Sequence, residues 1–435
     1  MKPVESQSPI HYSHDFISLN NQDSHIKPEH MNILLLEGVS QTAVAKFQSF
    51  GFDVELVTNA LPRKELLEKV KEAHVIGIRS KTQLDKEALE SARNLLAVGC
   101  FCIGTNQVNL KFAASRGIPV FNSPFSNSRS VAELMIGEII TLSRKLGDLN
   151  QQMHKGNWQK ISKNCYEIRG KTLGIVGYGH IGSQLSVLAE AMGMKVIFYD
   201  ILPIMPLGSA TSKNTLAEVL HLADYVTLHV PLTPETENMI QLPELKLMKK
   251  GAYFINASRG NVVDLDALAD VLESGHLGGA AIDVFPEEPE SNGEGFKHKL
   301  LGQKNVILTP HIGGSTEEAQ LAIGLEVSHA ITSYLTNGTT QGAVNFPQVA
   351  PKNLIPPCVR IINVHRNVPG VLNHINTLLS KYNIERQICE GQGDISYFLA
   401  DVNTGPTTNE NKVDKIRELM RSVESGVLTR VLASQ

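Results

Sequence analysis

A glycine-rich segment lies between two apolar runs near the middle of the chain. Its glycines are Gly177, Gly179 and Gly182, and the apolar runs that flank it cover residues 173–176 and 195–199. Spaced glycines between an apolar run and a helical pattern predict a strand, a tight turn and a helix that bind a dinucleotide. Because about 170 residues precede the segment, we expect a further unit to fold around it or ahead of it and to hold a substrate.

Each glycine has its own physical reason, and an acid completes the pattern. Gly177 permits the tight turn, Gly179 lets the backbone approach the pyrophosphate, and Gly182 lets the helix pack closely on the strand. The phosphates then meet free N–H groups at the positive end of the helix dipole. Asp200 closes the second apolar run, where its carboxylate can bond both ribose hydroxyls. The same carboxylate would repel the 2′-phosphate of NADP, so the sequence predicts NAD.

The composition is that of an ordinary globular chain. Its 435 residues suffice for about three domains, and 42% of them are hydrophobic. The net charge of −4 gives no reason to expect nucleic acid as a partner, and no apolar run reaches the roughly 20 residues of a membrane span. Five scattered cysteines, of which Cys100 and Cys102 form a C-x-C pair without a histidine cluster, predict reduced cytoplasmic thiols and no metal site.

Apolar runs, helical patterns and prolines divide the chain into segments. The first domain should contain strands near 32–36, 74–78, 95–99 and 119–121 with helical patterns between them, and a long helix should follow at about 130–145. We expect six segments: a disordered polar tail (1–30), the first part of a parallel α/β substrate domain (31–126), the dinucleotide domain (127–313), the second part of the substrate domain (314–345), a proline-rich linker (346–357) and a terminal domain (358–435).

The terminal domain has a recognisable order of elements. The pattern predicts a strand, a helix, two strands, a helix and a strand, at 359–364, 369–382, 384–389, 395–402, 411–423 and 427–432. This βαββαβ order is the ferredoxin-like arrangement. The small size of the domain favours a regulatory or assembly role over a catalytic one.

Polar side chains follow three predicted strands of the dinucleotide domain. Arg259 follows one strand, the acids Glu287 and Glu288 follow another, and His311 follows a third. An oxidoreductase that acts on a 2-hydroxy acid needs this set. A histidine takes the hydroxyl proton, a carboxylate orients the histidine and raises its pKa, and a guanidinium binds the substrate carboxylate.

These segments, together with residues 99–108 and 124–133, resemble the D-isomer-specific 2-hydroxyacid dehydrogenase family from about Asn32 to the last residues. The resemblance implies a Rossmann domain inserted in a flavodoxin-like α/β substrate domain, followed by a ferredoxin-like ACT domain. Within the family, the sequence is most similar to the branch that oxidises 3-phospho-D-glycerate with NAD, the first step of phosphorylated L-serine biosynthesis. Reduction of 2-oxoglutarate to 2-hydroxyglutarate is expected as a side activity.

The resemblance also assigns roles in catalysis and cofactor binding. It implies that Arg259 binds substrate, that His311 is the general acid/base, and that Glu288 rather than Glu287 is its partner, because Glu288 directly precedes Pro289. Eleven residues are expected to contact the cofactor: Gly177, Gly179, His180, Ile181, Gly182, Asp200, Ala257, Ser258, Asp283, Gly313 and Gly314.

In this family the first domain closes on the nucleotide domain and completes the substrate site. The backbone at Ile103 and Gly104 should receive the substrate carboxylate, and Arg79 and Lys81 are the candidates for its phosphate. A basic residue found near the position of Thr58 in some relatives is absent, so these two cations account for only part of the expected phosphate site.

The ACT resemblance rests on residues 364–372 and implies an effector site. His365 and Asn367 are expected to hold L-serine across a subunit interface. The third position is Glu385 here and asparagine in serine-sensitive relatives; glutamate loses a donor, so weaker serine binding is expected. The family further implies a homo-oligomer, most often a tetramer, with the helix at 130–145 in the dimer and the ACT domains joining dimers.

Two other activities stay open at this point. The chain could prefer another 2-oxo acid, such as glyoxylate, hydroxypyruvate or 2-oxoglutarate, although Arg79 and the ACT domain argue against the first two. The family also contains NAD-sensing transcriptional corepressors that keep the arginine, glutamate and histidine. Those proteins lack an ACT domain, and this sequence carries no evident peptide-recruitment feature.

Overall fold

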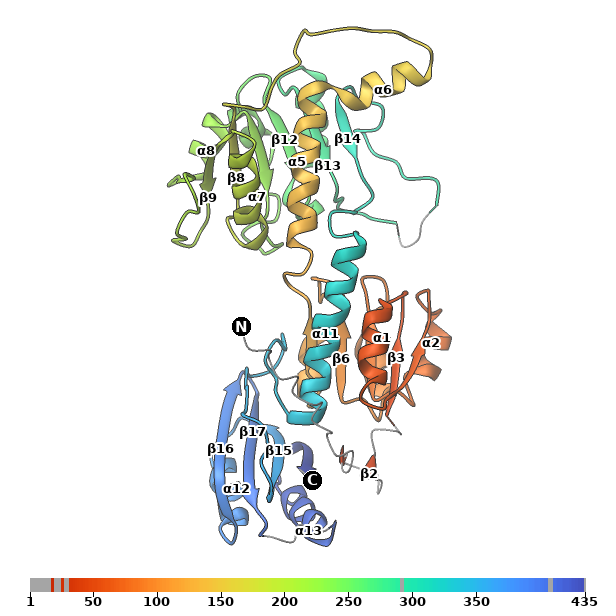
Figure 1. Cartoon of the computed structure of the whole chain (residues 1–435), viewed down its shortest axis with the longest axis vertical. Helices are drawn as coiled ribbons and strands as arrows, with labels where there is room; N and C mark the ends of the chain where they lie inside the picture. Colours follow the sequence, from red (N-terminus) through yellow and green to blue (C-terminus); the bar gives the residue numbers. More distant parts are fainter. Residues whose placement is uncertain (1–16, 19–24, 27–30, 290–292, 406–409, 434–435) are drawn as a thin grey trace, which may run out of the picture. The chain divides into compact units, whose positions relative to one another are not determined.

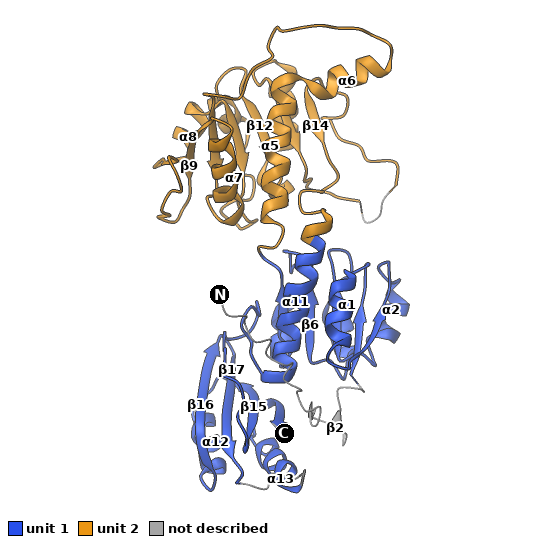
Figure 2. Cartoon of the chain, viewed as in Figure 1, with its two compact units in different colours: residues 1–124, 320–435 blue, residues 125–319 orange. Residues whose placement is uncertain are grey.

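The computed structural model describes residues 17–18, 25–26, 31–289, 293–405 and 410–433 (Figure 1). The predicted polar tail lies outside the described residues, apart from the short antiparallel pair β1 (Ile17–Ser18) and β2 (His25–Ile26). The chain forms two compact units, and the second, residues 125–319, interrupts the first, which comprises residues 1–124 and 320–435 (Figure 2).

The α/β domain of the first unit is built on a five-stranded parallel sheet of order β4-β3-β5-β6-β7. This is the flavodoxin-like order. The strands are β3 (Asn32–Leu35), β4 (Asp53–Leu56), β5 (Val75–Ile78), β6 (Ala97–Cys100) and β7 (Val120–Asn122). The helices are α1 (Gln41–Gln48), α2 (Arg63–Lys69), α3 (Lys86–Ser91), α4 (Leu110–Ser115) and α11 (Glu317–Asn337), of which α11 returns from the second unit.

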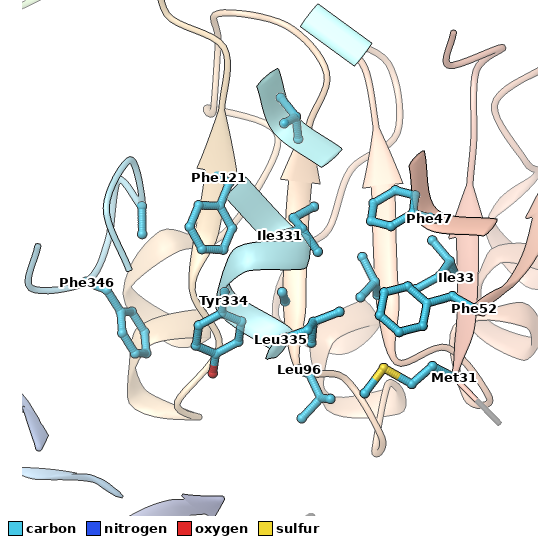
Figure 3. Close-up of a cluster of buried hydrophobic side chains, with 14 of the residues drawn as sticks. Met31, Ile33, Phe47, Phe52, Leu96, Phe121, Ile331, Tyr334, Leu335 and Phe346 are labelled. Atoms are coloured by element: carbon cyan, nitrogen blue, oxygen red, sulfur yellow. The ribbon is translucent and has the colours of Figure 1, made fainter. Parts of the chain in front are cut away.

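Alternation along the buried strands divides the core of this domain into two layers. Ile33 packs into a cluster that also contains side chains of α1 and α11, whereas the next residue, Leu34, packs into a cluster with side chains of α2, α3 and α4. Figure 3 shows the first cluster, in which Ile331 and Leu335 of α11 lie against the sheet. The aromatic rings of Phe121 and Tyr334 meet there at a centroid distance of 6.0 Å.

The edge strand β4 was not predicted from the sequence. The sequence predicts only helical patterns between the strands near 32–36 and 74–78, and the structure has β4 there between α1 and α2. In β4 the residues alternate between exposed and half-buried. An edge strand with one solvated face needs only this weak alternation, which is easily mistaken for a helical pattern.

The second unit is built on a seven-stranded parallel sheet of order β10-β9-β8-β11-β12-β13-β14, a Rossmann arrangement. Its strands are β8 (Thr172–Val176), β9 (Lys195–Tyr199), β10 (Thr211–Ser212), β11 (Tyr225–Leu228), β12 (Tyr253–Asn256), β13 (Gly279–Ile282) and β14 (Val306–Leu308). Its helices are α5 (Ser128–Arg144), α6 (Leu146–His154), α7 (His180–Ala191), α8 (Leu216–Leu222), α9 (Leu242–Leu247), the 3₁₀ turn η2 (Gly260–Val262) and α10 (Leu265–Glu273).

Helix α5 covers the predicted long helix, and α6 follows it directly. Lys145 adopts a left-handed backbone conformation with φ of 53°, which ends α5 and begins α6. Of the five apolar residues that predict this helix at a 3.6 period, Leu134 is half-buried and the other four are buried: Val131, Met135, Ile139 and Leu142. No helix in the described residues is both long and apolar enough to cross a membrane.

The terminal domain is an antiparallel sheet of order β16-β17-β15-β18 with two helices on one face. Its elements follow the predicted βαββαβ order: β15 (Cys358–Arg366), α12 (Val371–Leu379), β16 (Asn383–Gln392), β17 (Ile395–Asn403), α13 (Glu410–Arg421) and β18 (Gly426–Ala433). Ile361 packs under α12 and α13, while the neighbouring Ile362 packs into the cluster shared with the α/β domain.

The terminal domain and the α/β domain therefore belong to one compact unit. Tyr397 Oη donates to the carbonyl of Gly338 at 2.6 Å, and Arg430 Nη2 donates to the carbonyl of Leu335 at 2.6 Å. Within the predicted proline-rich linker, Phe346 and Val349 are buried in the shared cluster. These two apolar residues attach the linker to the core, which the proline count alone did not predict.

Candidate active site

The glycine-rich segment forms the turn between β8 and α7. Gly177 has φ of +91°, a left-handed conformation that favours glycine, and a Cβ there would collide with the backbone of His229. A Cβ on Gly182 would collide with the carbonyl of Gly177, so the helix can approach the turn only because Gly182 lacks one. A Cβ on Gly179 would meet nothing within 4 Å. The turn therefore packs tightly against the protein at Gly177 and Gly182. It leaves open space at Gly179, where a pyrophosphate can approach the backbone.

The first turn of α7 leaves donors free toward this open side. The helix begins at His180, and its cap residue Gly179 supplies no side chain to accept from the first N–H groups. The N–H groups of His180 and Ile181 have no acceptor among the described residues, as expected of an uncapped helix start. The imidazole of His180 stacks on Phe125 at a centroid distance of 3.6 Å.

Asp200 stands at the end of β9, beside the same turn. Its Oδ2 accepts from the N–H of Tyr178 at 2.7 Å, and its Oδ1 accepts from the N–H of Leu202 at 2.9 Å. Each carboxylate oxygen has a second lone pair, so the acid can still accept from ribose hydroxyls. The turn, the free amides and the acid together fit NAD.

The segment after β12 holds Arg259 in a fixed loop. Asn256 is buried, accepts from both the N–H and the hydroxyl of Ser258, and donates to the carbonyl of Arg259 at 3.0 Å. The Arg259 side chain is half-buried and donates to the carbonyl of Ser258 at 2.7 Å. A Cβ on Gly260 would collide with the backbone of Phe285, which brings this loop against the segment that follows β13.

Asp283 holds the loop that follows β14. It is 1% exposed, and its carboxylate accepts from the hydroxyl of Thr309 at 2.6 Å and from the N–H groups of Ile312 and Gly313 at 2.8 Å each. The sequence predicted Asp283 as a cofactor contact and did not foresee this second role. A buried acid at a strand end is the signal that could have indicated it, because such an acid must find donors.

His311 and Glu288 form the central pair of the site. His311 Nδ1 lies 2.8 Å from Glu288 Oε2, and Glu288 Oε1 accepts from the N–H of Phe285 at 3.2 Å. The histidine has φ of 54°, a left-handed conformation rare for a residue with a side chain and often found at functional sites. Because Nδ1 faces the acid, Nε2 is the ring nitrogen left to exchange a proton with a substrate.

The two groups shift each other's pKa. The hydrogen bond that His311 donates to Glu288 raises the pKa of His311, and this effect, with the charge of Glu288, outweighs burial, which lowers that pKa. Burial would raise the pKa of Glu288, but the hydrogen bond and charge of His311 together lower it below its ordinary value. The pair is therefore an imidazole made more basic by an ionised partner, a combination suited to general acid/base catalysis.

The other predicted cofactor residues lie at the same carboxyl edge of the sheet. Because all the strands are parallel, the segments after β8, β9, β12, β13 and β14 meet at one edge. Ala257 is half-buried in the loop after β12. Gly314 follows the His311 loop, and a Cβ there would collide with the amide of Asn127.

The predicted substrate residues lie in the first unit, at the carboxyl edge of the smaller sheet. Arg79 is half-buried and Lys81 exposed, and neither side chain has an acidic partner among the described residues. Glu37, missed by the sequence analysis, holds their loop: its carboxylate accepts from the N–H groups of Lys81 at 3.0 Å and Thr82 at 2.8 Å. Glu37 has a positive φ of 63°, a strained backbone conformation at the residue whose carboxylate accepts from this loop.

The structure does not bring the three predicted effector residues together within one chain. His365 is buried near one end of β15 and bonds Asn363 at 3.0 Å, and Asn367 follows it. Glu385 lies at a bulge near the other end of the sheet and accepts from Asn383 at 2.8 Å. His365 pairs with Ser396 and Glu385 lies beside residues 401–402, so the two are about 17 Å apart along the strands. A shared ligand would need residues from two copies.

Comparison with known proteins agrees with this site. The family described as "D-isomer specific 2-hydroxyacid dehydrogenase, NAD binding domain" matches residues 136–313. D-3-phosphoglycerate dehydrogenase 2 of Saccharomyces cerevisiae is 52% identical over 430 residues, covering 96% of this chain and 91% of the relative. D-3-phosphoglycerate dehydrogenase of Escherichia coli is 46% identical over 410 residues, covering 94% and 98% of the two chains.

A solved structure extends the comparison to the fold. The D-lactate dehydrogenase of Aquifex aeolicus, complexed with NAD and lactic acid, is 29% identical with a TM-score of 0.62, over 73% of this chain and all (100%) of that one. Fold and site together define an NAD-dependent oxidoreductase. More narrowly, the chain belongs to the D-isomer-specific 2-hydroxyacid dehydrogenase family.

Proposed function

We propose that this protein catalyses the NAD-dependent oxidation of 3-phospho-D-glycerate to 3-phosphohydroxypyruvate, the first step of phosphorylated L-serine biosynthesis. The observation that carries the chemistry is the 2.8 Å pair of His311 and Glu288 at the same sheet edge as the open glycine turn. The choice of substrate is supported by the relatives, which share their name and match nearly the whole chain.

The proton chemistry falls to residues of the second unit. Neutral His311 accepts the proton of the C2 hydroxyl at Nε2, and Glu288 stabilises the imidazolium that results. Arg259 binds the carboxylate as a two-pronged donor. NAD, when bound, supplies the acceptor for the hydride that leaves C2.

The phosphate and carboxylate ends of the substrate call for residues of the α/β domain. Arg79 and Lys81 present two cations without acidic partners among the described residues, and these suit the phosphate. The free backbone amides of Ile103 and Gly104 suit the carboxylate. An unphosphorylated hydroxy acid would need the amides but not both cations.

The test is a comparison of substrates on the full chain. NADH formation is measured with 3-phospho-D-glycerate, D-glycerate, D-lactate and D-2-hydroxyglutarate, with hydrazine present to trap the carbonyl product. We expect the highest kcat/KM for 3-phospho-D-glycerate, and slower turnover of D-2-hydroxyglutarate because its distal carboxylate mimics a phosphate. A higher kcat/KM for any unphosphorylated acid would overturn the substrate assignment.

A single variant tests whether Arg79 binds the substrate phosphate. Arg79→Ala should lower kcat/KM for 3-phospho-D-glycerate by about ten-fold or more, because a hydrogen bond to a charged group is worth about 1.5–3 kcal/mol. Turnover of D-glycerate should change little. Equal losses for the two substrates would show that Arg79 does not contact the phosphate.

We further propose a cytoplasmic homotetramer that L-serine inhibits through the ACT domains. The five cysteines are all free thiols, as expected in a reducing compartment, and the separation of His365 from Glu385 fits a ligand held between two copies. Millimolar L-serine should lower the rate of wild type and not that of His365→Ala, at equal oligomer size by light scattering. No effect on wild type would remove the effector proposal and leave the dehydrogenase proposal standing.

A further inference from the structure

Two amide side chains lie behind the backbone at Ile103 and Gly104. Asn122, the last residue of β7, donates through Nδ2 to the carbonyl of Ile103 at 2.7 Å. Gln107 donates through Nε2 to the carbonyl of Gly104 at 3.0 Å and to the carbonyl of Arg79 at 2.6 Å. Neither amide was singled out from the sequence, because asparagine and glutamine are common in loops.

These bonds fix the directions of the amides on the other side of the loop. In a trans peptide the C=O and the following N–H point in opposite directions. The carbonyl of Ile103 is held by Asn122, so the N–H of Gly104 is turned away from it. The carbonyl of Cys102 likewise accepts from the N–H of Ser123 at 3.1 Å, so the N–H of Ile103 is turned away from Ser123.

Both of these N–H groups are unused. Neither Ile103 nor Gly104 donates a backbone hydrogen bond to any residue that the structure describes. Two successive free amides form a concave anion site of the kind that holds carboxylates and phosphates. An organised anion site requires free N–H donors that face the anion and carbonyls that are hydrogen-bonded elsewhere, and this loop has both.

Gln107 also links this site to the loop of Arg79. Its side chain is 3% exposed and bonds carbonyls in the loops that follow β5 and β6. Its backbone carbonyl accepts from the N–H of Leu84 at 2.8 Å, which ties the far end of the same loop. The side chain and backbone of one residue therefore hold both ends of the segment that carries Arg79 and Lys81.

We propose that Asn122 and Gln107 are positioning residues that orient the carboxylate-binding amides, and that Gln107 also sets the Arg79 loop at a fixed distance from them. The carboxylate part concerns any 2-hydroxy acid, whereas the part about the Arg79 loop rests on the proposed phosphorylated substrate. Neither side chain touches the reacting atoms; both act through the backbone that they hold.

The domain offers a matched control. Asn345 is also a buried amide that bonds backbone: its Oδ1 accepts from the N–H of Val120 at 2.8 Å, and its Nδ2 donates to the carbonyl of Ile118 at 3.0 Å. It serves the start of β7, whereas Asn122 serves the end. Loss of Asn345 should therefore destabilise the domain without disturbing the amides of Ile103 and Gly104.

The experiment compares Asn122→Leu, Gln107→Met and Asn345→Leu with wild type in the full-length protein. Thermal unfolding, NADH affinity and steady-state rates with 3-phospho-D-glycerate and D-glycerate are measured for each. We expect Asn122→Leu to raise KM about ten-fold or more for both acids alike, at unchanged NADH affinity. Gln107→Met should raise KM more for the phosphorylated acid, and Asn345→Leu should lower the unfolding temperature with unchanged KM.

Two outcomes would overturn the proposal. One is a wild-type KM in folded Asn122→Leu and Gln107→Met; the other is an equal rise of KM in Asn345→Leu. If either leucine or methionine variant fails to fold, Asn122→Asp and Gln107→Glu replace them, because each keeps the size of the side chain and removes the donor. If wild type oxidises no phosphorylated acid, the proposed function fails, and the carboxylate part is judged on the 2-hydroxy acid that it does oxidise.

Discussion

At the scale of single residues, the site depends on groups that constrain one another. His311 has a raised pKa because its Nδ1 bonds Glu288, and the hydrogen bond and charge of His311 lower the pKa of Glu288 against the effect of burial. Asp283 holds the loop that carries the histidine through three hydrogen bonds. Loss of Glu288 should therefore change the pKa of His311. Loss of Asp283 should change the position of His311.

Glu288→Gln should move the pH profile of the reaction. Without the charged partner, the pKa of His311 falls back toward its ordinary value of 6.5. Oxidation needs a neutral base, so kcat/KM rises with pH through this pKa, and the rise should occur at lower pH in the variant. The plateau should drop about 10²-fold because the imidazolium loses its stabilising partner. Profiles of kcat/KM against pH measure both effects, and an unchanged midpoint would contradict the assigned pair.

Glu288→Gln should also change the stability of the fold, within a defined range of pH. The raised pKa of His311 stabilises the fold below 6.5 and stops doing so as the pH rises through the folded value. The lowered pKa of Glu288 stabilises above 4.5, and that contribution is lost as the pH falls through its folded value. The unfolding temperatures of wild type and Glu288→Gln should therefore differ most between pH 4.5 and 6.5.

The sequence predicted the types of these residues better than their arrangement. Arg259, Glu288 and His311 each follow an apolar strand, and the glycine spacing indicated its own turn. The loop-holding roles of five residues could not be predicted, because their partners are mostly backbone groups of loops; these residues are Asn256, Asp283, Glu37, Asn122 and Gln107. Hydrogen bonds to distant backbone leave no periodic pattern in a sequence.

At the scale of elements, the parallel strands do most to assemble the site. Short apolar runs bounded by polar residues predicted β3, β5, β6 and β7, whereas β4 lacks such a run and was not predicted. Helix α5 was predicted from its apolar spacing, and one residue on its buried side breaks the pattern. Glu138 is 4% exposed, and neither of its carboxylate oxygens has a partner among the described residues.

Glu138→Gln should stabilise the protein in a pH-dependent way. Burial, with the nearby charge of Asp283, raises the pKa of Glu138 from 4.5 to about 8. The folded state therefore keeps a proton that the unfolded chain releases, so stability falls as the pH rises from 4.5 to about 8. Glutamine removes that loss, on the order of a few kcal/mol at the upper end. Denaturant unfolding of both proteins across this range is the measurement, and a difference independent of pH would contradict a neutral Glu138.

At the scale of the whole molecule, the order of the chain accounts for the mid-chain position of the cofactor turn. The second unit is inserted between the two segments of the first, and α11 returns the chain to the α/β domain (Figure 2). The βαββαβ order of the terminal domain was predictable from apolar alternation. Its attachment to the α/β domain was not, because the contacts join residues far apart in sequence.

A buried ion pair marks that attachment. Arg360 of β15 is fully buried, pairs with Asp401 at 2.6 and 2.8 Å, and donates to the carbonyl of Asn337 at 2.8 Å. Asp401→Asn leaves the guanidinium without its charge partner and should cost about 3–5 kcal/mol of unfolding free energy. The exposed pair of Lys71 and Glu68 is the control, and Lys71→Gln should cost less than about 1 kcal/mol. Equal effects by calorimetry would show that the buried pair does not stabilise the unit.

The most direct test of the proposed dehydrogenase activity is NADH formation from 3-phospho-D-glycerate by wild type and His311→Ala, measured together with NADH binding by fluorescence. We predict turnover in wild type and a rate lower by about 10²-fold or more in the variant, because the base is lost. NADH affinity should be equal in the two proteins, since the glycine turn and Asp200 are unchanged. Comparable turnover in His311→Ala, or no NADH from 3-phospho-D-glycerate in wild type, would contradict the account.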